Sequence, residues 1–450
     1  MKLIGFFLTI AFSLLAQQNT SLTLHSYAAI TDLNAYAKPS LPQSGPGSPG
    51  FGPAGTLYTD PVFGSHIVRI TDAHSVPQGN GFYTTSAAYL NAWSSDDRAF
   101  MLVSDQGATG IFDFDPLLLR AKFHAWATVG YPIFSYRFPH LLYGSAGQTI
   151  ASWDYTTGRS TTILDLTQVK PFSGYIGPVT ISGDDSVLAV AFGGQQDTYP
   201  YVVVYNRATS GMHLLDLSAS TVDGIPTNVS FAPGVHSMQM DMSGHYLEVA
   251  VQNIGTFVWN LDTLLFTQVP FNPAGSGHST LGFGMKFNQS GFLTNTGTSD
   301  SRGFTLRPLS DPADPAAMHQ VITNPPSAPF SWTEDGHWAW ANAKPGQSIP
   351  VCGSFYSQAP FTPWETWFDE IVCVATDGSG TVWRIAHHRS TFNGNFWSEP
   401  RGNVSQDGRF FIFTSNWDQT LDPTGQRLDV FLVDLASAGA KKVPSLLPLR

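Results

Sequence analysis

Imidazole and guanidinium groups that could bind metals, bind anions or transfer protons are concentrated in the second half of this 450-residue chain. His236 and His278 each stand just before a predicted strand, His387 and His388 are adjacent, and Arg401 follows them. Neutral imidazoles with oxygen ligands suit manganese or zinc, and an imidazole can also act as a general base near neutral pH. The residue types therefore predict a divalent metal at His278, His387 and His388, or acid–base chemistry at His236 and Arg401.

Aromatic residues form a second group of candidates. Tyr83, Tyr131 and Tyr175 stand at comparable points before three predicted strands in the first half of the chain. Their rings can stack on sugars or on partner side chains, and a phenol can also take part in proton transfer. We expect a catalytic role for Tyr175 beside His236 and Arg401. The expected ligand-binding residues are Tyr83, Tyr131, Trp397 and Glu399.

Each candidate also has a structural interpretation that the sequence leaves open. Gly277-His278-Ser279 resembles the Gly-His pair of WD-type repeats, in which the histidine ties neighbouring strands together. The tyrosines could be core or rim aromatics, and Arg401 could form an ion pair with Glu399 or Asp407. A glycosidase would need two carboxylates on one face, for which the candidates are Glu399 with Asp369 or Glu370.

The candidates lie between copies of a repeated turn-and-strand unit. In residues 399–417 a short strand near 402–405 leads into the turn Gln406-Asp407-Gly408, and an apolar strand, Arg409–Ser415, runs back. Gly408 suits the positive φ of such a turn, and the aromatic run suits a strand covered on both faces. Six earlier turns of the same kind are predicted at 94–97, 135–138, 182–185, 241–244, 288–291 and 333–336.

The spacing of these turns predicts an all-β fold, a seven-bladed β-propeller. Successive turns end at residues 97, 138, 185, 244, 291, 336 and 408, and most steps are close to the forty-odd residues of a four-stranded blade. The last step is longer and predicts an inserted rim loop at about 344–367. The lone strand Pro61–Thr71 precedes the first repeat, so we expect it to complete the last blade and close the ring. The expected third strands are Gly110–Phe114, Thr149–Tyr155, Tyr201–Asn206, Thr256–Leu261 and Leu428–Leu435.

A propeller would bring the candidates to one face. The last strand of each blade connects to the innermost strand of the next blade across that face, around a central channel. We therefore expect the histidines, Glu399 and Arg401 at one side of the channel mouth and the three tyrosines at the other. A concave apolar ring with a few converging polar groups is the default place for a ligand.

Composition limits the possible partners. Charged residues make up 12% of the chain, against roughly 25% in a typical soluble domain. The 22 basic and 33 acidic residues give a net charge of −11, which offers no electrostatic footprint for nucleic acid. Cys352 and Cys373, the two cysteines, favour a disulfide in an exported chain, with two buried thiols as the alternative.

The chain is expected to be secreted or periplasmic. Residues 1–16 combine Lys2, an apolar run and Ala16, as in a signal peptide. The run is shorter than the roughly 20 residues of a membrane span, so an uncleaved anchor is the alternative and the mature chain has no predicted span. We expect a Gly- and Pro-rich linker at 17–56, the propeller at 57–440 and a tail at 441–450, in a monomer.

Over about residues 57–435 the repeated turn-and-strand pattern resembles TolB-type and WD40-like propeller repeats. With its histidine-rich connections between blades, the chain also resembles the oligogalacturonate lyase group. Members of that group place a metal among several histidines and a glutamine, beside a catalytic histidine and arginine. As a pattern, the resemblance implies such a site at His236, His278, His387, His388 and Arg401.

Two functions follow from these observations. The first is binding of a glycan or protein ligand at the channel mouth through Tyr and Trp rings. The second is a metal-assisted polysaccharide lyase or related carbohydrate-active enzyme, in which a cation or Arg401 would neutralise a uronate carboxylate while His or Tyr moves protons. Convergence of His236, His278 and one of His387 or His388 within metal-ligand reach would favour the enzyme. Separate burial of these rings would favour the binding protein.

Overall fold

Strands and turns make up nearly all of the part of the chain that the structure, a computed structural model, describes. That part contains one short helix, α1 (Leu166–Val169), and two 3-10 turns, η1 (Phe396–Ser398) and η2 (Leu435–Ser437). The predicted all-β class is therefore confirmed, whereas the predicted signal peptide, the tail from 441 and His278 lie outside the described residues. The described residues are 37–41, 51–196, 198–232, 234–270, 279–284, 289–295, 303–314, 316–317, 319–323, 334–340, 350–357, 367–376 and 381–437.

Within these residues the strands form seven antiparallel sheets, most of them built from consecutive segments of chain. Three come from the first half: β3 (Phe82–Tyr83), β4 (Ala99–Ser104), β5 (Thr109–Asp115) and β6 (Arg120–Trp126); β7 (Gly130–Phe134), β8 (Leu141–Ala146), β9 (Thr149–Asp154) and β10 (Arg159–Asp165); and β11 (Ile176–Ile181), β12 (Val187–Phe192), β13 (Tyr201–Asn206) and β14 (Gly211–Asp216), with the added β15 (Thr221–Val222) and β16 (Ile225–Pro226).

Three further sheets follow in the second half: β17 (Val235–Met240), β18 (Tyr246–Val251), β19 (Gly255–Asn260) and β20 (Leu265–Gln268); β21 (Ser279–Gly284), β22 (Gln289–Asn295), β23 (Gly303–Pro308) and β24 (His319–Thr323); and β25 (Glu334–Ala339), β26 (Val351–Ser357), β27 (Glu370–Val374) and β28 (Val382–His387). The last sheet joins both ends of the chain in the order β1-β2-β31-β30-β29. Its strands are β1 (Leu57–Thr59), β2 (His66–Arg69), β29 (Gly402–Val404), β30 (Phe410–Ser415) and β31 (Asp429–Asp434).

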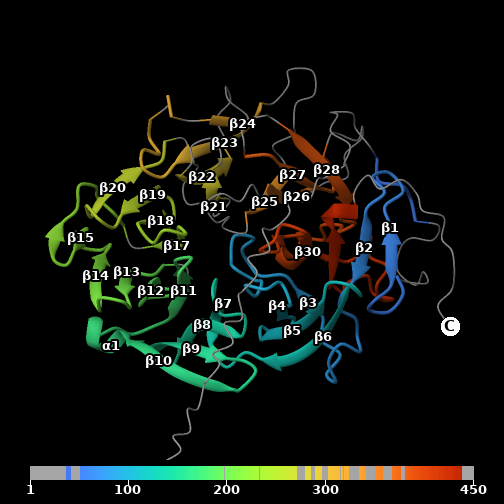
Figure 1. The fold of residues 1–450 in the computed structure, drawn as a ribbon, viewed down its shortest axis with the longest axis horizontal. Helices are drawn as coiled ribbons and strands as arrows, with labels where there is room; N and C mark the ends of the chain where they lie inside the picture. The colour runs from blue at the N-terminus through green and yellow to red at the C-terminus, as the bar shows by residue number, and fades with distance from the viewer. Residues whose placement is uncertain are drawn as a thin grey trace, which may run out of the picture.

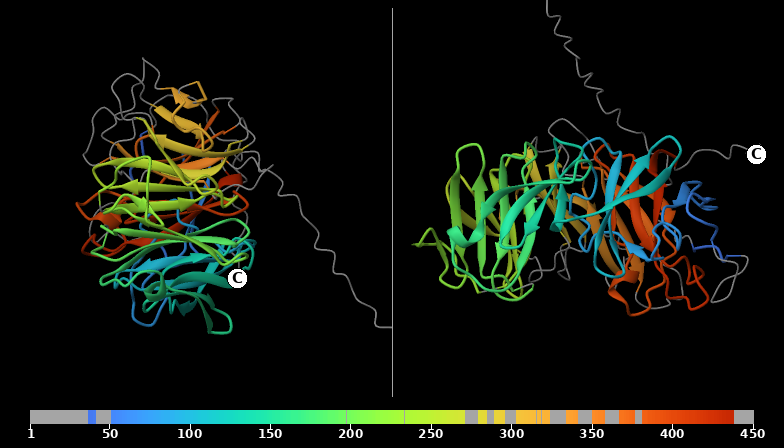
Figure 2. Two further views of the ribbon diagram at one scale, coloured as in Figure 1. Left: turned by 90° about the vertical axis from the view of Figure 1, so that its left-hand side faces the viewer. Right: turned by 90° about the horizontal axis from the view of Figure 1, so that it is seen from below.

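The sheets follow one another around a common centre, as Figure 1 shows, and their strands run along the short axis of the molecule in Figure 2. The innermost strands β7, β11, β17, β21, β25 and β29 contact one another in that order. Apolar side chains pack between facing sheets, so strands such as β12 are buried along their whole length. One such contact joins Phe114 of β5 edge-on to Phe410 of β30, with ring centroids 5.1 Å apart.

The repeated turn is confirmed at five of its predicted positions. Asp97, Asp185, Gly244 and Gly408 close four of these turns with φ of 57°, 61°, 75° and 72°, and the fifth joins β7 to β8. The turns predicted at 288–291 and 333–336 are wrong, because residues 289–291 belong to β22 and residues 334–336 to β25. A Ser-Gly or Asp-Gly pair permits a turn, but pairing with the neighbouring strand decides whether the chain turns there.

Turn aspartates also join neighbouring sheets. Asp97 accepts the backbone N–H groups of Gln406 and Asp407 at 2.6 and 2.9 Å. Asp185 accepts the backbone N–H of Tyr136 and the hydroxyl of Tyr143, both at 3.1 Å. Burial, with the nearby charge of Asp407, raises the pKa of Asp97 well above its ordinary value. Each carboxylate therefore fixes the neighbouring sheet at its turn.

The N-terminal strand predicted at 61–71 is present but shorter, and it is not alone. β2 pairs with β31 in the register His66↔Asp434, and β1 adds a further strand on its outer side. Parts of the predicted linker also pack here: Phe51 lies edge-on against Trp417 at 4.5 Å, and Lys38 lies 3.2 Å from Asp369, which stands directly before β27 of the preceding sheet. Parts of a linker with few apolar residues can thus be held in place by single contacts to an aromatic ring or a carboxylate.

The rim loop predicted at 344–367 is wrong where the structure describes it, because residues 351–357 form β26. The long step between predicted turns begins at the turn predicted for 333–336, which falls in β25. Cys352 of β26 and Cys373 of β27 lie directly opposite each other and form a disulfide with an S–S distance of 2.03 Å. The favoured alternative for the two cysteines is therefore confirmed.

The innermost strand of the first sheet is interrupted. β3 pairs with β4 as far as Tyr83, and contact with β4 resumes at Ala92, whose carbonyl accepts the N–H of Met101 at 2.9 Å. Residues 84–91 between these points leave the sheet, and the blue trace after β3 runs toward the centre of Figure 1. We call residues 84–91 the central loop.

A fully buried carboxyl group lies between the sheets of β18 and β21. Glu248 accepts hydrogen bonds from Gln239 Nε2 at 3.0 Å and from Ser279 Oγ at 2.7 Å. Burial raises the pKa of Glu248 to about 7, and the two hydrogen bonds offset this only in part. Because the folded-state pKa lies above the ordinary value, the folded protein binds more protons than the unfolded chain between these two values. Its stability therefore falls as the pH rises through that window.

We expect Glu248→Gln to remove this pH dependence, because the amide has the same shape, can hydrogen-bond to both neighbours and does not ionise. The pKa difference corresponds to about 3 kcal/mol. The variant should therefore be more stable than the wild type by up to about 3 kcal/mol at pH 8 and nearly equal to it at pH 4. Urea unfolding at both pH values measures the difference. If the unfolding free energies of the two proteins depend on pH in the same way, Glu248 is not the source of the pH dependence.

Candidate functional site

A cavity of about 990 Å³ opens at the face where the innermost strands begin. Its walls come from the first residues of β7, β11 and β17, the loops that follow β4, β8 and β12, and the segment before β29. Residues of the central loop also line it. We call it the mouth cavity, and its aromatic and charged lining includes Tyr131, Tyr175, His236, His337, Trp397 and Arg401.

The structure brings five of the predicted site residues together in this cavity. They belong to segments far apart in the sequence and meet because each lies at the same end of its sheet. Three aromatic side chains of the cavity are exposed: Tyr131 by 44%, Tyr175 by 57% and Phe396 by 50%. The cavity therefore presents accessible aromatic rings. The five residues are Tyr131, Tyr175, His236, Trp397 and Arg401.

Arg401 ties the segment before β29 to the central loop. Its Nη1 donates to the carbonyl of Ser86 at 3.1 Å, and its Nη2 donates to the carbonyl of Phe396. The guanidinium lies over the Phe396 ring, 3.3 Å from its centroid, and 5.3 Å from that of Trp397. Arg401 therefore holds both rings in place while keeping its charge at the cavity wall.

Glu399 lies between Arg401 and a histidine that the sequence did not single out. Glu399 Oε2 is 3.8 Å from Arg401 Nη2 and 3.4 Å from His337 Nε2. The sequence predicts a turn at 333–336, directly before His337, whereas His337 lies in the innermost strand β25. A carboxylate between an imidazole and a guanidinium can bind donors or assist proton transfer.

Tyr175 stands next to Gly174, whose backbone packs closely against Gly194. Gly174 has a φ of 106°, and a Cβ at this position would lie 1.9 Å from the carbonyl oxygen of Gly194. Tyr175 accepts the N–H of Gly193 at 2.8 Å and donates its own N–H to Gly194 at 3.3 Å. Only glycine fits at position 174, and it fixes the loop that presents Tyr175.

His236 lies near the start of β17, beside the cavity. Its Nδ1 and the hydroxyl of Ser237 are both buried, and neither has a hydrogen-bond partner among the described residues. Both residues line the mouth cavity. Buried polar atoms are normally bonded, so these two atoms mark a place where a ligand or water could bind.

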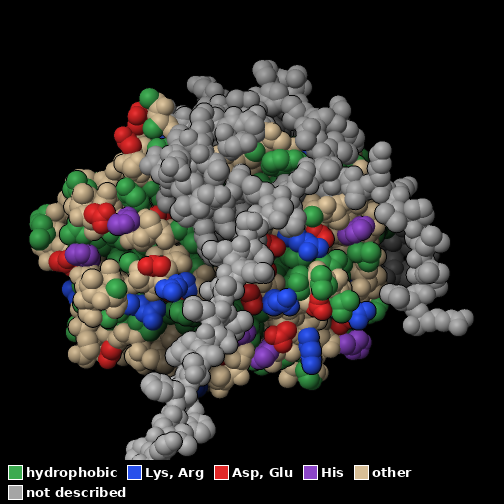
Figure 3. Space-filling view, viewed as in Figure 1, with side chains coloured by type: hydrophobic (Ala, Val, Ile, Leu, Met, Phe, Trp, Pro, Cys, Tyr) green, Lys and Arg blue, Asp and Glu red, His purple; other side chains and the backbone are tan. Residues whose placement is uncertain are grey.

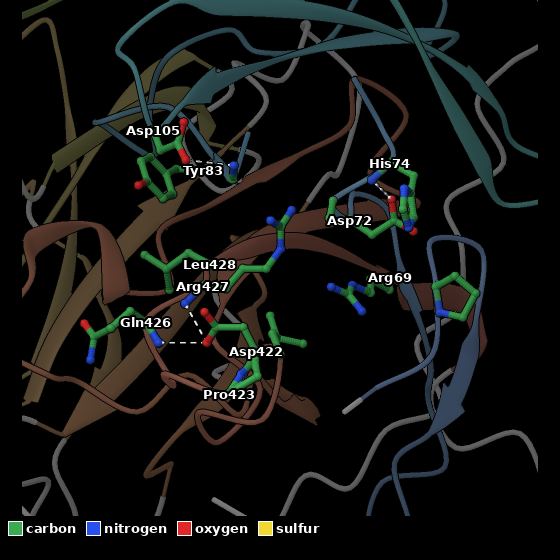
Figure 4. Close-up of a pocket in the computed structure, with 14 residues that line it drawn as sticks. Arg69, Asp72, His74, Tyr83, Asp105, Asp422, Pro423, Gln426, Arg427 and Leu428 are labelled. Carbon is green, nitrogen blue, oxygen red and sulfur yellow. Dashed lines mark hydrogen bonds between the residues drawn. The ribbon is translucent and has the colours of Figure 1, made fainter. Parts of the chain in front are cut away.

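Tyr83 lies behind the mouth cavity rather than in it. Its ring stacks on Trp397 at 4.8 Å and 16°, and it lines a separate cavity of about 580 Å³, shown in Figure 4. Two guanidinium groups line this second cavity, those of Arg69 and Arg427, and both bind the buried Asp429. The two arginines therefore belong to the region where the two ends of the chain pair. Tyr83 contributes to the mouth cavity only by supporting the Trp397 ring.

His387 and His388 are buried at the end of β28, the outermost strand of its sheet, and neither lines the mouth cavity. His387 Nδ1 lies 3.1 Å from Asp60 Oδ2. His388 donates from Nε2 to the Phe355 carbonyl at 2.7 Å and accepts the Ser390 N–H at Nδ1, at 3.0 Å. Burial lowers the pKa of His388 to about 4, so its ring is neutral and both nitrogens are occupied. The expected approach of these rings to His236 is not seen, because three strand spacings, about 14 Å, separate an outermost from an innermost strand.

Both ring nitrogens of His388 are therefore already bonded within the protein, and His278 lies outside the described residues. In the part of the chain that the structure describes, no three His, Cys, Asp or Glu side chains are grouped so that they could hold an ion. Nor is any helix of that part long and apolar enough to cross a membrane. Acidic and basic side chains are interspersed on the face shown in Figure 3.

Comparison with known proteins supports the architecture. No protein-family model matches the chain, and a search of curated proteins found no match. Among solved structures, an oligogalacturonate lyase from Vibrio parahaemolyticus is similar with a TM-score of 0.51 and 9% identity, over 84% of this chain and 96% of that chain. An oligogalacturonate lyase in complex with manganese is similar with a TM-score of 0.53 and 10% identity, over 84% and 95%. These neighbours are propellers, and at such identities the likeness concerns the fold alone.

Proposed function

We propose that the protein is a seven-bladed β-propeller, closed by the pairing of β2 with β31, that binds a glycan in its mouth cavity. The observation that carries the binding role is a large cavity with exposed Tyr131, Tyr175 and Phe396 rings beside Trp397. Aromatic faces stack on sugar rings, and sites of this kind add a few polar groups for orientation. His236 and Arg401 supply such groups here. The seven antiparallel sheets and the similar propeller structures support the ring.

The test is a glycan array followed by calorimetric titration of the best ligand. We expect Trp397→Ala to weaken binding by at least tenfold, because it removes a stacking ring and frees Tyr83 and Arg401 from their contacts. Phe138→Ala is the control: Phe138 is an aromatic residue that is 50% exposed, but it lies in the turn at the opposite end of β7, away from the mouth cavity. Absence of any glycan ligand, or equal affinity of the wild type and the Trp397 variant, would refute the proposal.

A metal-assisted lyase or related carbohydrate-active enzyme is the second candidate. It is favoured by one observation: His236, Tyr175 and Arg401, the three residues expected to be catalytic, line the same cavity. If the protein is a lyase, uronate polymers should yield unsaturated products that absorb in the ultraviolet, and His236→Ala should abolish them. Metal analysis of protein purified without chelators, beside His278→Ala, tests the metal separately.

We also propose that the mature protein is a secreted or periplasmic monomer. The Cys352–Cys373 disulfide supports an oxidising compartment. Fractionation of expressing cells, followed by N-terminal sequencing and light scattering of the purified protein, tests location and oligomeric state. A reduced, cytoplasmic protein that begins at Met1 would overturn the proposed export.

A further inference from the structure

The central loop fills the middle of the ring. Tyr89, Leu90 and Asn91 border two small cavities beneath the mouth cavity, of about 20 and 10 Å³. Residues of β7, β11, β17 and β21 line the first of these, and residues at β25 and β29 line the second. The loop therefore faces the innermost strands of the six other sheets. The two cavities hold about one water each at most, so no ligand passes the loop.

Side chains of neighbouring sheets tie the loop in place. Asn403 Nδ2 donates to the carbonyls of Ala88 and Leu90 at 2.7 and 3.1 Å. On the other side Asn91 Nδ2 donates to the carbonyl of Phe134 at 2.9 Å. These bonds join the loop to β29 and β7, which lie on either side of the loop's own sheet. A ligand would therefore meet a fixed floor.

We infer that the mouth cavity is a blind cup that receives the free end of a linear glycan, with Tyr89 as the residue that limits its depth. Tyr89 and Leu90 both line the mouth cavity and the two small cavities beneath it, so these residues lie where the cavities meet, and Tyr89 has the larger side chain. A chain threaded through the centre would need an open path, which the central loop blocks. A cavity of about 990 Å³ above this floor accommodates a short terminal segment. The inference rests on the proposed glycan binding.

The experiment measures how glycan affinity depends on the length of the oligosaccharide and on the number of chain ends in a polymer. Calorimetry is carried out with linear oligosaccharides of two to eight sugars from cellulose, xylan, mannan, starch and pectin, and with each parent polymer before and after partial depolymerisation. For the series that binds, we expect affinity to rise with length until the cup is full and then to stay constant. Binding per mass of polymer should increase in proportion to the number of ends created.

Tyr89→Ala should move the plateau to a longer oligosaccharide by about one sugar, because the floor is lowered into the cavities beneath. Tyr89→Phe, which keeps the ring, should leave the plateau unchanged, and thermal unfolding shows whether each variant is folded. Affinity that keeps rising with length, or polymer binding that is independent of the number of ends, overturns end-on binding while leaving glycan binding intact. No binding in any series overturns the proposed function and this inference with it.

Discussion

Arg384→Ala is expected to destabilise the protein by about 3–5 kcal/mol, because it leaves a buried carboxylate without its cation. Arg384 and Glu370 are both fully buried on β28 and β27. Arg384 Nε donates to one Glu370 oxygen at 2.7 Å, and its Nη2 donates to the other. Burial raises the pKa of Glu370 although Arg384 opposes this, so the carboxylate without its partner would ionise only at a large cost. Urea or thermal unfolding at pH 7 measures the loss.

Arg409→Ala is the matched control. Arg409 also binds a carboxylate with two nitrogens, at 3.4 and 3.1 Å from Asp434, but its side chain is 30% exposed. Water solvates such an exposed pair, so we expect a loss of about 1 kcal/mol or less. The double variant Glu370→Leu/Arg384→Met should recover much of the stability, since no charge remains buried. Equal losses for the Arg384 and Arg409 variants would show that burial of the pair is unimportant.

Trp417→Ala is expected to cost about 3–5 kcal/mol and to loosen the N-terminal segment. The Trp417 ring is 1% exposed. It stacks on Phe431 of β31 at 4.7 Å and meets Phe51 and Tyr58 edge-on at 4.5 and 5.1 Å. Truncation would leave a cavity where the two ends of the chain join, so we expect faster proteolytic cleavage before Tyr58 as well as a lower unfolding midpoint.

Trp397→Ala serves as the comparison, because it removes the same side chain from the mouth cavity. We expect the Trp397 variant to lose ligand affinity with little loss of stability. For Trp417→Ala we expect the reverse. If Trp417→Ala unfolds at the wild-type denaturant concentration and resists protease equally well, the ring does not hold the two ends together.

The sequence by itself determined most of the strands and turns. Strand length, apolar runs and turn residues such as Gly408 are local properties, and local backbone preferences decide them. The third strands predicted at Tyr201–Asn206 and Leu428–Leu435 correspond to β13 and β31. The sequence favoured the disulfide, but the pairing of β26 with β27, which places the two cysteines opposite each other, was not predicted.

Part of the candidate site was also predictable. Tyr131, Tyr175 and His236 precede or open innermost strands, and Arg401 stands directly before β29. In a ring of sheets these positions meet at one face, so position along the repeat was sufficient to place them. Trp397 was expected among them and lines the same cavity.

The tertiary structure alone decided the rest. His387 and His388 end the outermost strand β28, so the order of strands in the sheet places them at the rim, against Asp60 and Phe355, and not at the channel. His337 meets Glu399, and the central loop lies among the innermost strands, through contacts between segments distant in the sequence. Periodicity specifies which residues form strands, but which ends meet, and what fills the space between them, depends on the packing of all the sheets around one centre.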